Sequence, residues 1–282
     1  MSRVSVLMSV YKAEKAEYLE KALESILGQT RRPDEIVLVE DGPIGDELAH
    51  VIARVAERVS VGTDGRDVTE FKIVKLSENQ KLGRALASGF AACTGDLIAR
   101  MDTDDIAVPN RLELQCAYMA EHGSVAAVGG DIAEFIDEGK ILRVKHMPTS
   151  SEALYAYGKL RNPLNHMTVM FRRADIAEVG GYRHFPGLED YDLWSRLLAA
   201  GKQIGNIPEV LVEARIDRDF AGRRGGWKYF LNYASLRWEQ YRLGYTSFWE
   251  YMKGLACSAV MTIQPGWLRE LSYRWLRKSK KK

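Results

Sequence analysis

The stretch "LIARMDTDDI", residues 97–106, joins an apolar run to three carboxylates that lie within four positions. The apolar run has the composition of a buried strand, and Asp102, Asp104 and Asp105 follow it directly. Carboxylates this close in the sequence repel one another, and a strand does not need acids in order to end. We therefore expect these three side chains to be gathered for binding.

The chain before this stretch alternates between strand patterns and helix patterns. Continuous apolar runs indicate strands buried on both faces, and apolar residues at helical spacing indicate helices. The predicted strands are 4–10, 33–42, 71–76 and 96–101, and the predicted helices are 16–29, 45–59 and 82–93. Such an order is typical of a parallel sheet with helices on both faces.

Polar residues stand where three of these strands end. The first strand ends at Ser9–Tyr11, the second at Glu40–Gly42, and the fourth at Asp102–Asp105. Ligands of open α/β sheets bind beyond the carboxyl ends of the strands. The sequence therefore predicts a binding site along this edge of the sheet.

The middle of the chain is less regular. Gly129-Gly130 and the segment 137–140 are predicted turns, the second within a hairpin. Residues 166–171 are a strand candidate. A helix is predicted to begin near Glu189 and Asp190, since acids in a first turn suit the helix dipole.

From about residue 220 the chain is rich in aromatic and basic residues. Apolar stripes over 227–241 and 248–255 predict two helices, and 267–275 predicts a third. We expect one domain over 1–219 and a C-terminal helical, basic extension over 220–282. Aromatic and basic residues together suit a membrane interface, so we expect peripheral membrane contact through this extension. The alternative is a basic tail that serves solubility alone.

Composition excludes several classes of protein. The net charge of +2 over 282 residues gives no global basic field, so no nucleic-acid partner is expected. Three scattered cysteines do not form a disulfide framework, and each is expected to be a small buried hydrophobe in a reducing compartment. No run approaches the roughly 20 apolar residues of a membrane span. We expect a cytoplasmic protein, at the inner face of the cell membrane.

Three metal or phosphate chemistries compete for the acids at 102–105. An EF-hand loop would require a ligand where Ile106 stands and glycine where Ala107 stands. A phosphatase-type motif would require an early strand followed by a glycine turn. Carboxylates that hold Mg²⁺ or Mn²⁺ against a nucleotide diphosphate fit best, because these hard cations prefer carboxylate and phosphate oxygens.

The chain resembles the family 2 glycosyltransferases, especially the bacterial enzymes that build capsular, exopolysaccharide or O-antigen chains. The resemblance covers nearly the whole chain and rests on five segments in order: "VSVLMSVY", "EIVLVEDG", "GDLIARMDTDD" followed by "PNRL", "NHMTVMFRR", and "GGYRHFPGLEDYDLWSRL". It implies the GT-A fold, a Rossmann-like, mostly parallel sheet with helices on both faces.

The resemblance also implies roles on the nucleotide side of the site. Residues Ser9 to Tyr11 and Asp41 are expected to hold the nucleobase, with Asp41 accepting the N3 proton of uracil or thymine. Lys81 and Arg84 lie in a region that often contacts the nucleotide. The expected donor is a nucleotide sugar, with UDP-sugars first.

The remaining implied roles concern metal and catalysis. Asp102 is expected to contact the ribose. Asp104 is expected to bind the divalent metal that bridges the two phosphates, with Asp102 and Asp105 as neighbouring candidate ligands. Asp190 matches the family's general base, and Glu189 is expected to help place the acceptor. Asp192 competes for the role of base. For His166, a packed histidine is weighed against a role near the phosphates.

The chain departs from the family pattern at two places. Glu40-Asp41-Gly42-Pro43 replaces the usual Asp-Asp-Gly-Ser, and the Gln-x-x-Arg-Trp motif of processive members is absent after Asp190. We therefore expect transfer of a single sugar to a growing saccharide, including one carried on polyprenyl diphosphate. A carboxylate base and a metal suffice for one inverting displacement.

Two other classes of function stay open at this point. A sugar-phosphate nucleotidyltransferase would need a glycine-rich basic loop after the first strand, where residues 9–23 contain no glycine. A non-catalytic nucleotide-sugar-binding subunit would not need Asp104 and Asp190, which are present.

Overall fold

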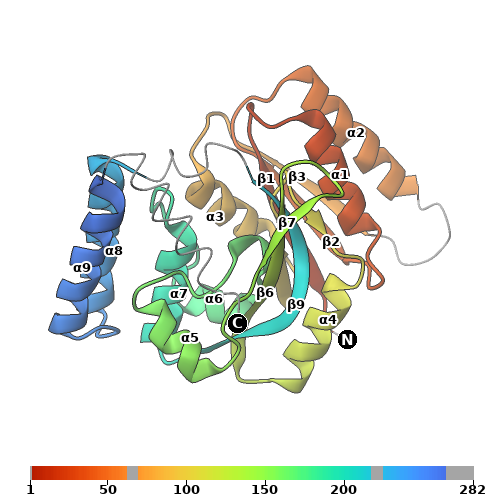
Figure 1. Cartoon of the computed structure of the whole chain (residues 1–282). Helices are drawn as coiled ribbons and strands as arrows, with labels where there is room; N and C mark the ends of the chain where they lie inside the picture. Colours follow the sequence, from red (N-terminus) through yellow and green to blue (C-terminus); the bar gives the residue numbers. More distant parts are fainter. Residues whose placement is uncertain (1, 62–68, 217–224, 265–282) are drawn as a thin grey trace.

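A nine-stranded mixed sheet forms the centre of the molecule (Figure 1). The computed structural model describes residues 2–61, 69–216 and 225–264. The strand order is β3-β2-β1-β4-β8-β6-β9-β5, and β7 pairs with β6 beside this path. The sheet therefore combines a parallel half built from the first hundred residues with a mixed half built from the next hundred.

The parallel half follows the alternation that the sequence predicts. Its elements are β1 (Val4–Val10), α1 (Ala16–Leu27), β2 (Glu35–Glu40), α2 (Asp46–Val61), β3 (Glu70–Lys75), α3 (Leu82–Ala92) and β4 (Leu97–Arg100). Successive side chains of β1 enter different cores. Val6 and Met8 pack with α1 and α2, whereas Leu7 packs with α3. Both faces of the parallel strands are thus covered by helices, as predicted.

The second half crosses back over the sheet. Its elements are β5 (Ile106–Ala107), α4 (Arg111–Glu121), β6 (Val125–Phe135), β7 (Ile141–Lys145), α5 (Ser151–Gly158), the 3-10 helix η1 (His166–Thr168), β8 (Met170–Arg172), α6 (Arg173–Glu178), α7 (Glu189–Ala199) and β9 (Gln203–Arg215). Strand β8 runs antiparallel to β4, and β6 runs parallel to β9. The predicted hairpin at 137–140 is confirmed as the turn between β6 and β7.

Three predictions are wrong in detail. Gly129-Gly130 is not a turn but lies inside β6. A Cβ on Gly130 would lie 2.5 Å from Leu211 Cδ1, so glycine here permits the close approach of β6 and β9. The strand predicted over 166–171 begins only at Met170, after η1. Cys257 is exposed, whereas Cys93 is buried as expected.

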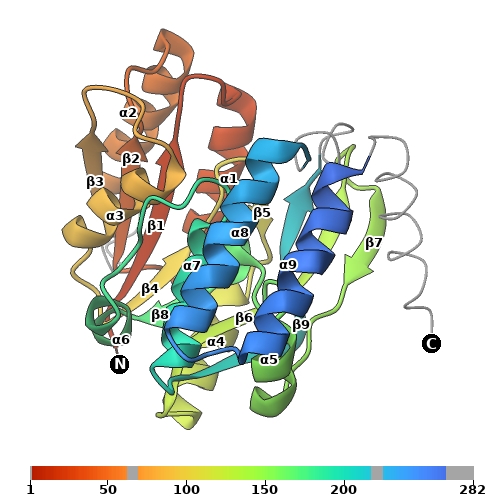
Figure 2. The same cartoon turned by 90° about the vertical axis from the view of Figure 1, so that its left-hand side faces the viewer.

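Two helices, α8 (Trp227–Arg242) and α9 (Phe248–Ile263), form an outer layer. Figure 2 shows them side by side in front of α7. Leu236 of α8 is buried against Leu188 and Tyr191 at the start of α7. The third helix predicted over 267–275 and the domain boundary predicted at 219–220 lie outside the described residues. Within the described ranges, no helix has both the length and the apolar character to cross a membrane.

Glu35 anchors the amino-terminal edge of the parallel half. Its buried carboxylate accepts hydrogen bonds from Ser5, from Lys72, and from the backbone and hydroxyl of Thr94 at 2.9 and 3.0 Å. Burial by itself raises the pKa of Glu35, but these hydrogen bonds outweigh it and lower the pKa to about 2. One ionised side chain therefore joins β1, β2, β3 and the turn that precedes β4.

We expect the substitution Glu35→Gln to lower the free energy of unfolding by about 2 kcal/mol at neutral pH. Because the folded-state pKa lies below the unfolded value of 4.5, this contribution is complete above about pH 4.5 and is lost as pH falls towards 2. Urea unfolding of both proteins at pH 7 and at about pH 3 measures the difference at each pH.

The matched control is Glu70→Gln, which removes an exposed carboxylate that also pairs with Lys72, at 3.2 Å. We expect its effect to stay within about 0.5 kcal/mol. A Glu35→Gln effect of equal size at both pH values would contradict an ionised Glu35 as the source of stability.

Candidate active site

Three carboxylates meet at the carboxyl end of β4. The ligand oxygens of Asp102, Asp104 and Asp105 all lie within 4.8 Å of one another. The structure therefore brings these three acids together, as their spacing predicts. They differ in burial and partners, and these differences separate their roles.

Asp102 is held by a buried arginine. Arg100, the last residue of β4, is 2% exposed, and its two terminal nitrogens donate to the two carboxylate oxygens of Asp102. Arg111 holds the backbone of Arg100 in place, since its Nη2 donates to the Arg100 carbonyl at 2.7 Å. Burial tends to lower the pKa of Arg100, but the charge of Asp102, its hydrogen bonds and the charges of Tyr182 and Asp105 together outweigh burial and raise the pKa. The guanidinium therefore stays charged and orients Asp102.

Asp105 links the loop of residues 101–105, called the acid loop below, to strand β9 near the far end of the sheet. It is buried, and its Oδ1 accepts from the backbone N–H of Arg215 at 2.7 Å. Arg215 Nε also donates to the Asp104 carbonyl at 3.1 Å. Burial and the charges of Asp102 and Asp104 raise the pKa of Asp105 well above its usual value. Asp105 thus serves to position the loop against β9.

Asp104 lies among acids. Burial, and then the charges of Asp102 and Glu14, raise the pKa of Asp104 to about 7. Glu14 is fixed beside the loop because Thr103 Oγ1 donates to its Oε2 at 2.9 Å. A partly buried carboxylate with two acidic neighbours has a deficit of positive charge. A hard divalent cation would remove this deficit, and the oxygen donors present suit such a cation.

Asp41 holds the loop that leads into α3. Its Oδ2 accepts from Asn79 Nδ2 at 2.9 Å, and its Oδ1 accepts from the Gln80 backbone N–H at 2.6 Å. Lys81 follows with φ 71°, a conformation that costs energy for a residue other than glycine. The carboxylate oxygens of Asp41 keep further lone pairs for a ligand. Asp41 is therefore both a structural anchor and a candidate ligand group.

The other residues predicted to contact the nucleotide lie at the same edge. Tyr11 follows β1 and is exposed, and the Ser9 carbonyl accepts from Thr103 Oγ1 at 3.4 Å. Lys81 and Arg84 are exposed at the start of α3. The first strand end thus contacts the acid loop, whereas Lys81 is tied to Asp41 through Gln80.

The starts of α3 and α7 meet beside the acid loop. A Cβ on Gly83 would lie 2.4 Å from the Arg183 carbonyl and 3.3 Å from Glu189 Cβ. Only glycine permits this approach of the two helices. Burial, and then the charge of Asp190, raise the pKa of Glu189 to about 7. Asp190 differs, because Asn162 Nδ2 donates to its Oδ2 and the Tyr191 backbone N–H donates to its Oδ1 at 2.8 Å.

Tyr182, which is hydrogen-bonded to His166, is under the electrostatic influence of both groups of acids, that after β4 and that at the start of α7. Tyr182 Oη and His166 Nε2 share a hydrogen bond of 2.9 Å. The pKa of Tyr182 is raised by burial, and charges of Arg100, Asp190, Glu189 and Asp102 all act on it. Burial, with the charge of Arg100, lowers the pKa of His166, so its ring is neutral. The charges after β4 and at the start of α7 thus act on the same buried tyrosine.

Asp192 has a structural role. Its Oδ2 accepts from Arg196 at 2.8 and 3.0 Å, and both side chains are buried. Arg196 also donates to the carbonyls of Val179 and Gly181. Asp192 is therefore buried and paired with Arg196, which holds α7 to the turn before Tyr182.

Sequence reasoning missed four residues of this site: Glu14, Arg100, Asn162 and Tyr182. A signal existed for Arg100, because it is a charged residue inside an otherwise apolar strand. Asn162 lies in an irregular segment and reaches Asp190 across 28 positions. No local pattern marks such a contact.

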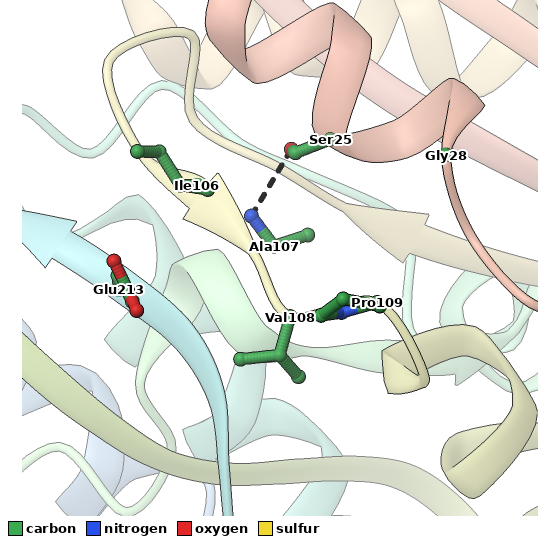
Figure 3. A pocket seen from close by; sticks show the side chains of 7 residues that line it. All are labelled: Ser25, Gly28, Ile106, Ala107, Val108, Pro109 and Glu213. Atoms are coloured by element: carbon green, nitrogen blue, oxygen red, sulfur yellow. Dashed lines mark hydrogen bonds between the residues drawn. The ribbon is translucent and has the colours of Figure 1, made fainter.

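A pocket whose lining includes the residues directly after Asp105 contains none of the three acids. Figure 3 shows that it is lined by Ser25 and Gly28 of the α1 end, by residues 106–109, and by Glu213. Ser25 Oγ accepts from the Ala107 backbone N–H at 3.1 Å across it. Glu213 is its only ionisable lining residue. The pocket therefore offers no acid cluster.

Solved structures share the fold at low sequence identity. TarS 1-349 from S. aureus, in complex with UDP-GlcNAc, matches with a TM-score of 0.64 and 16% identity, over 84% of this chain and 66% of that chain. The present chain spans 39% of the longer TarS chain. Mannosyltransferase PcManGT from Pyrobaculum calidifontis, with GDP-Man and Mn²⁺, matches with a TM-score of 0.59 and 16% identity, over 98% and 80%. These likenesses show the GT-A fold.

Two curated relatives are closer in sequence. The amylovoran biosynthesis glycosyltransferase AmsE of Erwinia amylovora is 41% identical over 225 residues, 80% of this chain and 80% of that protein. The UDP-Gal:alpha-D-GlcNAc-diphosphoundecaprenol beta-1,3-galactosyltransferase of Escherichia coli is 33% identical over 273 residues, 96% and 95% of the two chains.

The model of glycosyl transferase family 2 matches residues 5–178, which include the acid loop and the strand ends beside it. The match and the relatives decide against a nucleotidyltransferase and against a non-catalytic subunit. The chain belongs to glycosyl transferase family 2 and is a glycosyltransferase related to enzymes of bacterial polysaccharide biosynthesis.

Proposed function

We propose that this enzyme transfers a single sugar from a UDP-sugar to a growing, lipid-linked saccharide, with a divalent metal and with inversion at the anomeric carbon. The observation that carries the proposal is the position of Asp104. It is a carboxylate with a raised pKa in a cluster where the guanidinium of Arg100 is already paired with Asp102. The charges of Asp102, Glu189 and Asp190 all act on Tyr182.

The donor side rests on the acid loop and the ends of β1 and β2. Asp104 would hold Mn²⁺ or Mg²⁺, with Asp102 and Asp105 as neighbouring candidate ligands. The metal would offset the charge that develops on the leaving diphosphate. Asp102, oriented by Arg100, would bind the ribose. Asp41 would accept the N3 proton of the nucleobase.

The relatives support this choice of substrates. The Escherichia coli relative is named for UDP-Gal and for a diphosphoundecaprenol-linked acceptor. TarS binds UDP-GlcNAc, and PcManGT binds GDP-Man with Mn²⁺. We propose a UDP-sugar and a lipid-linked acceptor for this chain because the relative that covers nearly its whole length combines both. The two substrates would then meet at the inner face of the cell membrane.

The acceptor side rests on Asp190 and Glu189. Asn162 and the Tyr191 backbone N–H donate hydrogen bonds to the two oxygens of the Asp190 carboxylate and so orient it. An ionised carboxylate can take the proton from an acceptor hydroxyl. Glu189, with its pKa raised to about 7, can keep a proton and donate a hydrogen bond to the acceptor. One base on the face opposite the leaving group gives inversion.

The donor site predicts metal-dependent nucleotide binding. We expect UDP with Mn²⁺, at about a hundredfold excess over Kd, to raise Tm by about 5 °C. Without metal we expect a much smaller rise, because the diphosphate would face Asp104 directly. Thermal-shift assays with UDP, GDP, TDP and CDP, each with and without Mn²⁺, measure this. Asp104→Asn should remove the metal-dependent part, whereas the exposed Glu178→Gln on α6 should leave it intact. Equal shifts with and without metal would refute the role of Asp104.

The base assignment predicts a separation of catalysis from donor binding. We expect Asp190→Asn to lower kcat on the order of a hundredfold to ten-thousandfold, with the UDP-induced rise in Tm unchanged. Glu189→Gln keeps the hydrogen-bonding capacity and should cost less. Steady-state kinetics of both variants provide the test. Full activity of Asp190→Asn would remove Asp190 from the mechanism, and a greater loss in Glu189→Gln would transfer the role to Glu189.

A further inference from the structure

The outer face of α8 and α9 concentrates exposed apolar side chains. Of the fourteen exposed large apolar residues in the described part of the chain, eight lie on these two helices. These eight include Trp227 and Trp238 on α8, and Trp249, Met252, Val260 and Ile263 on α9. Trp249 is 78% exposed. Figure 2 looks onto this flank, where the two helices form one layer. A patch of this kind marks a surface that binds a partner.

Helix α9 reverses the usual arrangement of an amphipathic helix, because it buries small residues and exposes large apolar ones. Its buried residues are Gly254, Ser258 and Thr262, and two of these bond within the helix, since Ser258 Oγ donates to the Gly254 carbonyl and Thr262 Oγ1 to the Ser258 carbonyl. A Cβ on Gly254 would lie 2.9 Å from Arg237 Cδ, so the small residue permits close packing on α8. A helix of a water-soluble protein buries its large apolar residues. Here the small residues face the protein and the large ones face outward.

Charge identifies the partner. Glu250 and Lys253 are the only charged residues in α9, and Glu250 is paired with Lys159 at 2.7 Å. The last ten residues of the helix, 254–263, carry no charge. The sequence that follows is strongly basic and has a single acid, Glu270; its basic residues are Arg269, Arg274, Arg277, Lys278 and Lys280–Lys282. The uncharged segment 254–263, followed in the sequence by a cluster of cations, complements an anionic bilayer, in which acyl chains lie beneath anionic headgroups.

We propose that the outer face of α8 and α9 lies on the surface of an anionic lipid bilayer. Trp227, Trp238 and Trp249 enter the interfacial region, which favours tryptophan. Met252, Val260 and Ile263 contact the acyl boundary. The basic residues after position 264 add attraction to anionic headgroups.

This contact deepens the proposed function and rests on it for its purpose. Helix α8 packs directly on Leu188 and Tyr191, the residues that flank Glu189 and Asp190. Arg237 of α8 also donates to Tyr191 Oη at 2.9 Å. A helix is about 10 Å across, so the layer would hold Asp190 roughly one helix diameter above the bilayer. An acceptor carried on a lipid diphosphate would then reach the base.

The test uses the full chain and vesicle co-sedimentation. We expect binding to vesicles of phosphatidylethanolamine with phosphatidylglycerol, weaker binding to phosphatidylcholine alone, and weakening by salt. Trp249→Glu and Val260→Glu should each lower the partition coefficient about tenfold, the worth of one large apolar side chain. Leu142→Glu is the matched control. Leu142 is 55% exposed on β7, away from this layer, and its replacement should change nothing.

Unchanged binding in both helix variants would overturn the proposal. A second pair of results would also overturn it. Light scattering would show a dimer of the native protein that Trp249→Glu converts to a monomer, and the native protein would not bind vesicles. That result would assign the face to a second copy. Transfer to a water-soluble acceptor separates this proposal from the proposed function. It should be unchanged in Trp249→Glu. A native protein that binds vesicles but transfers sugar to neither a water-soluble nor a lipid-linked acceptor would refute the function alone.

Discussion

The buried Arg100 is the cation on which the arrangement of acids depends. A buried guanidinium is costly unless it is paired and hydrogen-bonded, and Asp102 pairs with both of its terminal nitrogens. Its positive charge also acts on Glu189, Tyr182 and His166. Without it, the carboxylates after β4 and at the start of α7 would lose a positive charge that acts on both groups. In the proposed function, Arg100 therefore lets a donor site and an acceptor site share one edge of the sheet.

The compensation is incomplete, and the incompleteness is chemically useful. Arg100 is committed to Asp102, and the backbone of Arg215 is committed to Asp105. Asp104 is left beside Glu14 and Asp102 with a raised pKa. In the proposed function, a divalent cation would bind at this carboxylate. The same logic separates the two carboxylates of α7, because burial raises the pKa of Glu189 while Asn162 and a backbone N–H donate to Asp190.

Helices α8 and α9 connect the start of α7, which carries Glu189 and Asp190, to an exposed apolar surface. Helix α8 buries Leu236 against the residues around Glu189 and Asp190, and α9 packs on α8 through small residues. The large apolar side chains that a helix usually buries are consequently free to meet a partner. In the proposed arrangement, one layer both supports the catalytic helix and brings it to the lipid that carries the acceptor.

The sequence by itself determined the parallel half of the sheet and the gathering of acids at its edge. Both follow from local rules, since apolar periodicity defines each element and parallel strands place their carboxyl ends together. The predicted turn at Gly129-Gly130 was wrong, because glycine is favoured both in turns and where two backbones approach closely. Only the tertiary structure decided which acid is tied to protein and which is left for a ligand. Contacts such as Asn162 with Asp190, or Arg215 with Asp105 across 110 positions, depend on how distant segments pack. No local pattern encodes them.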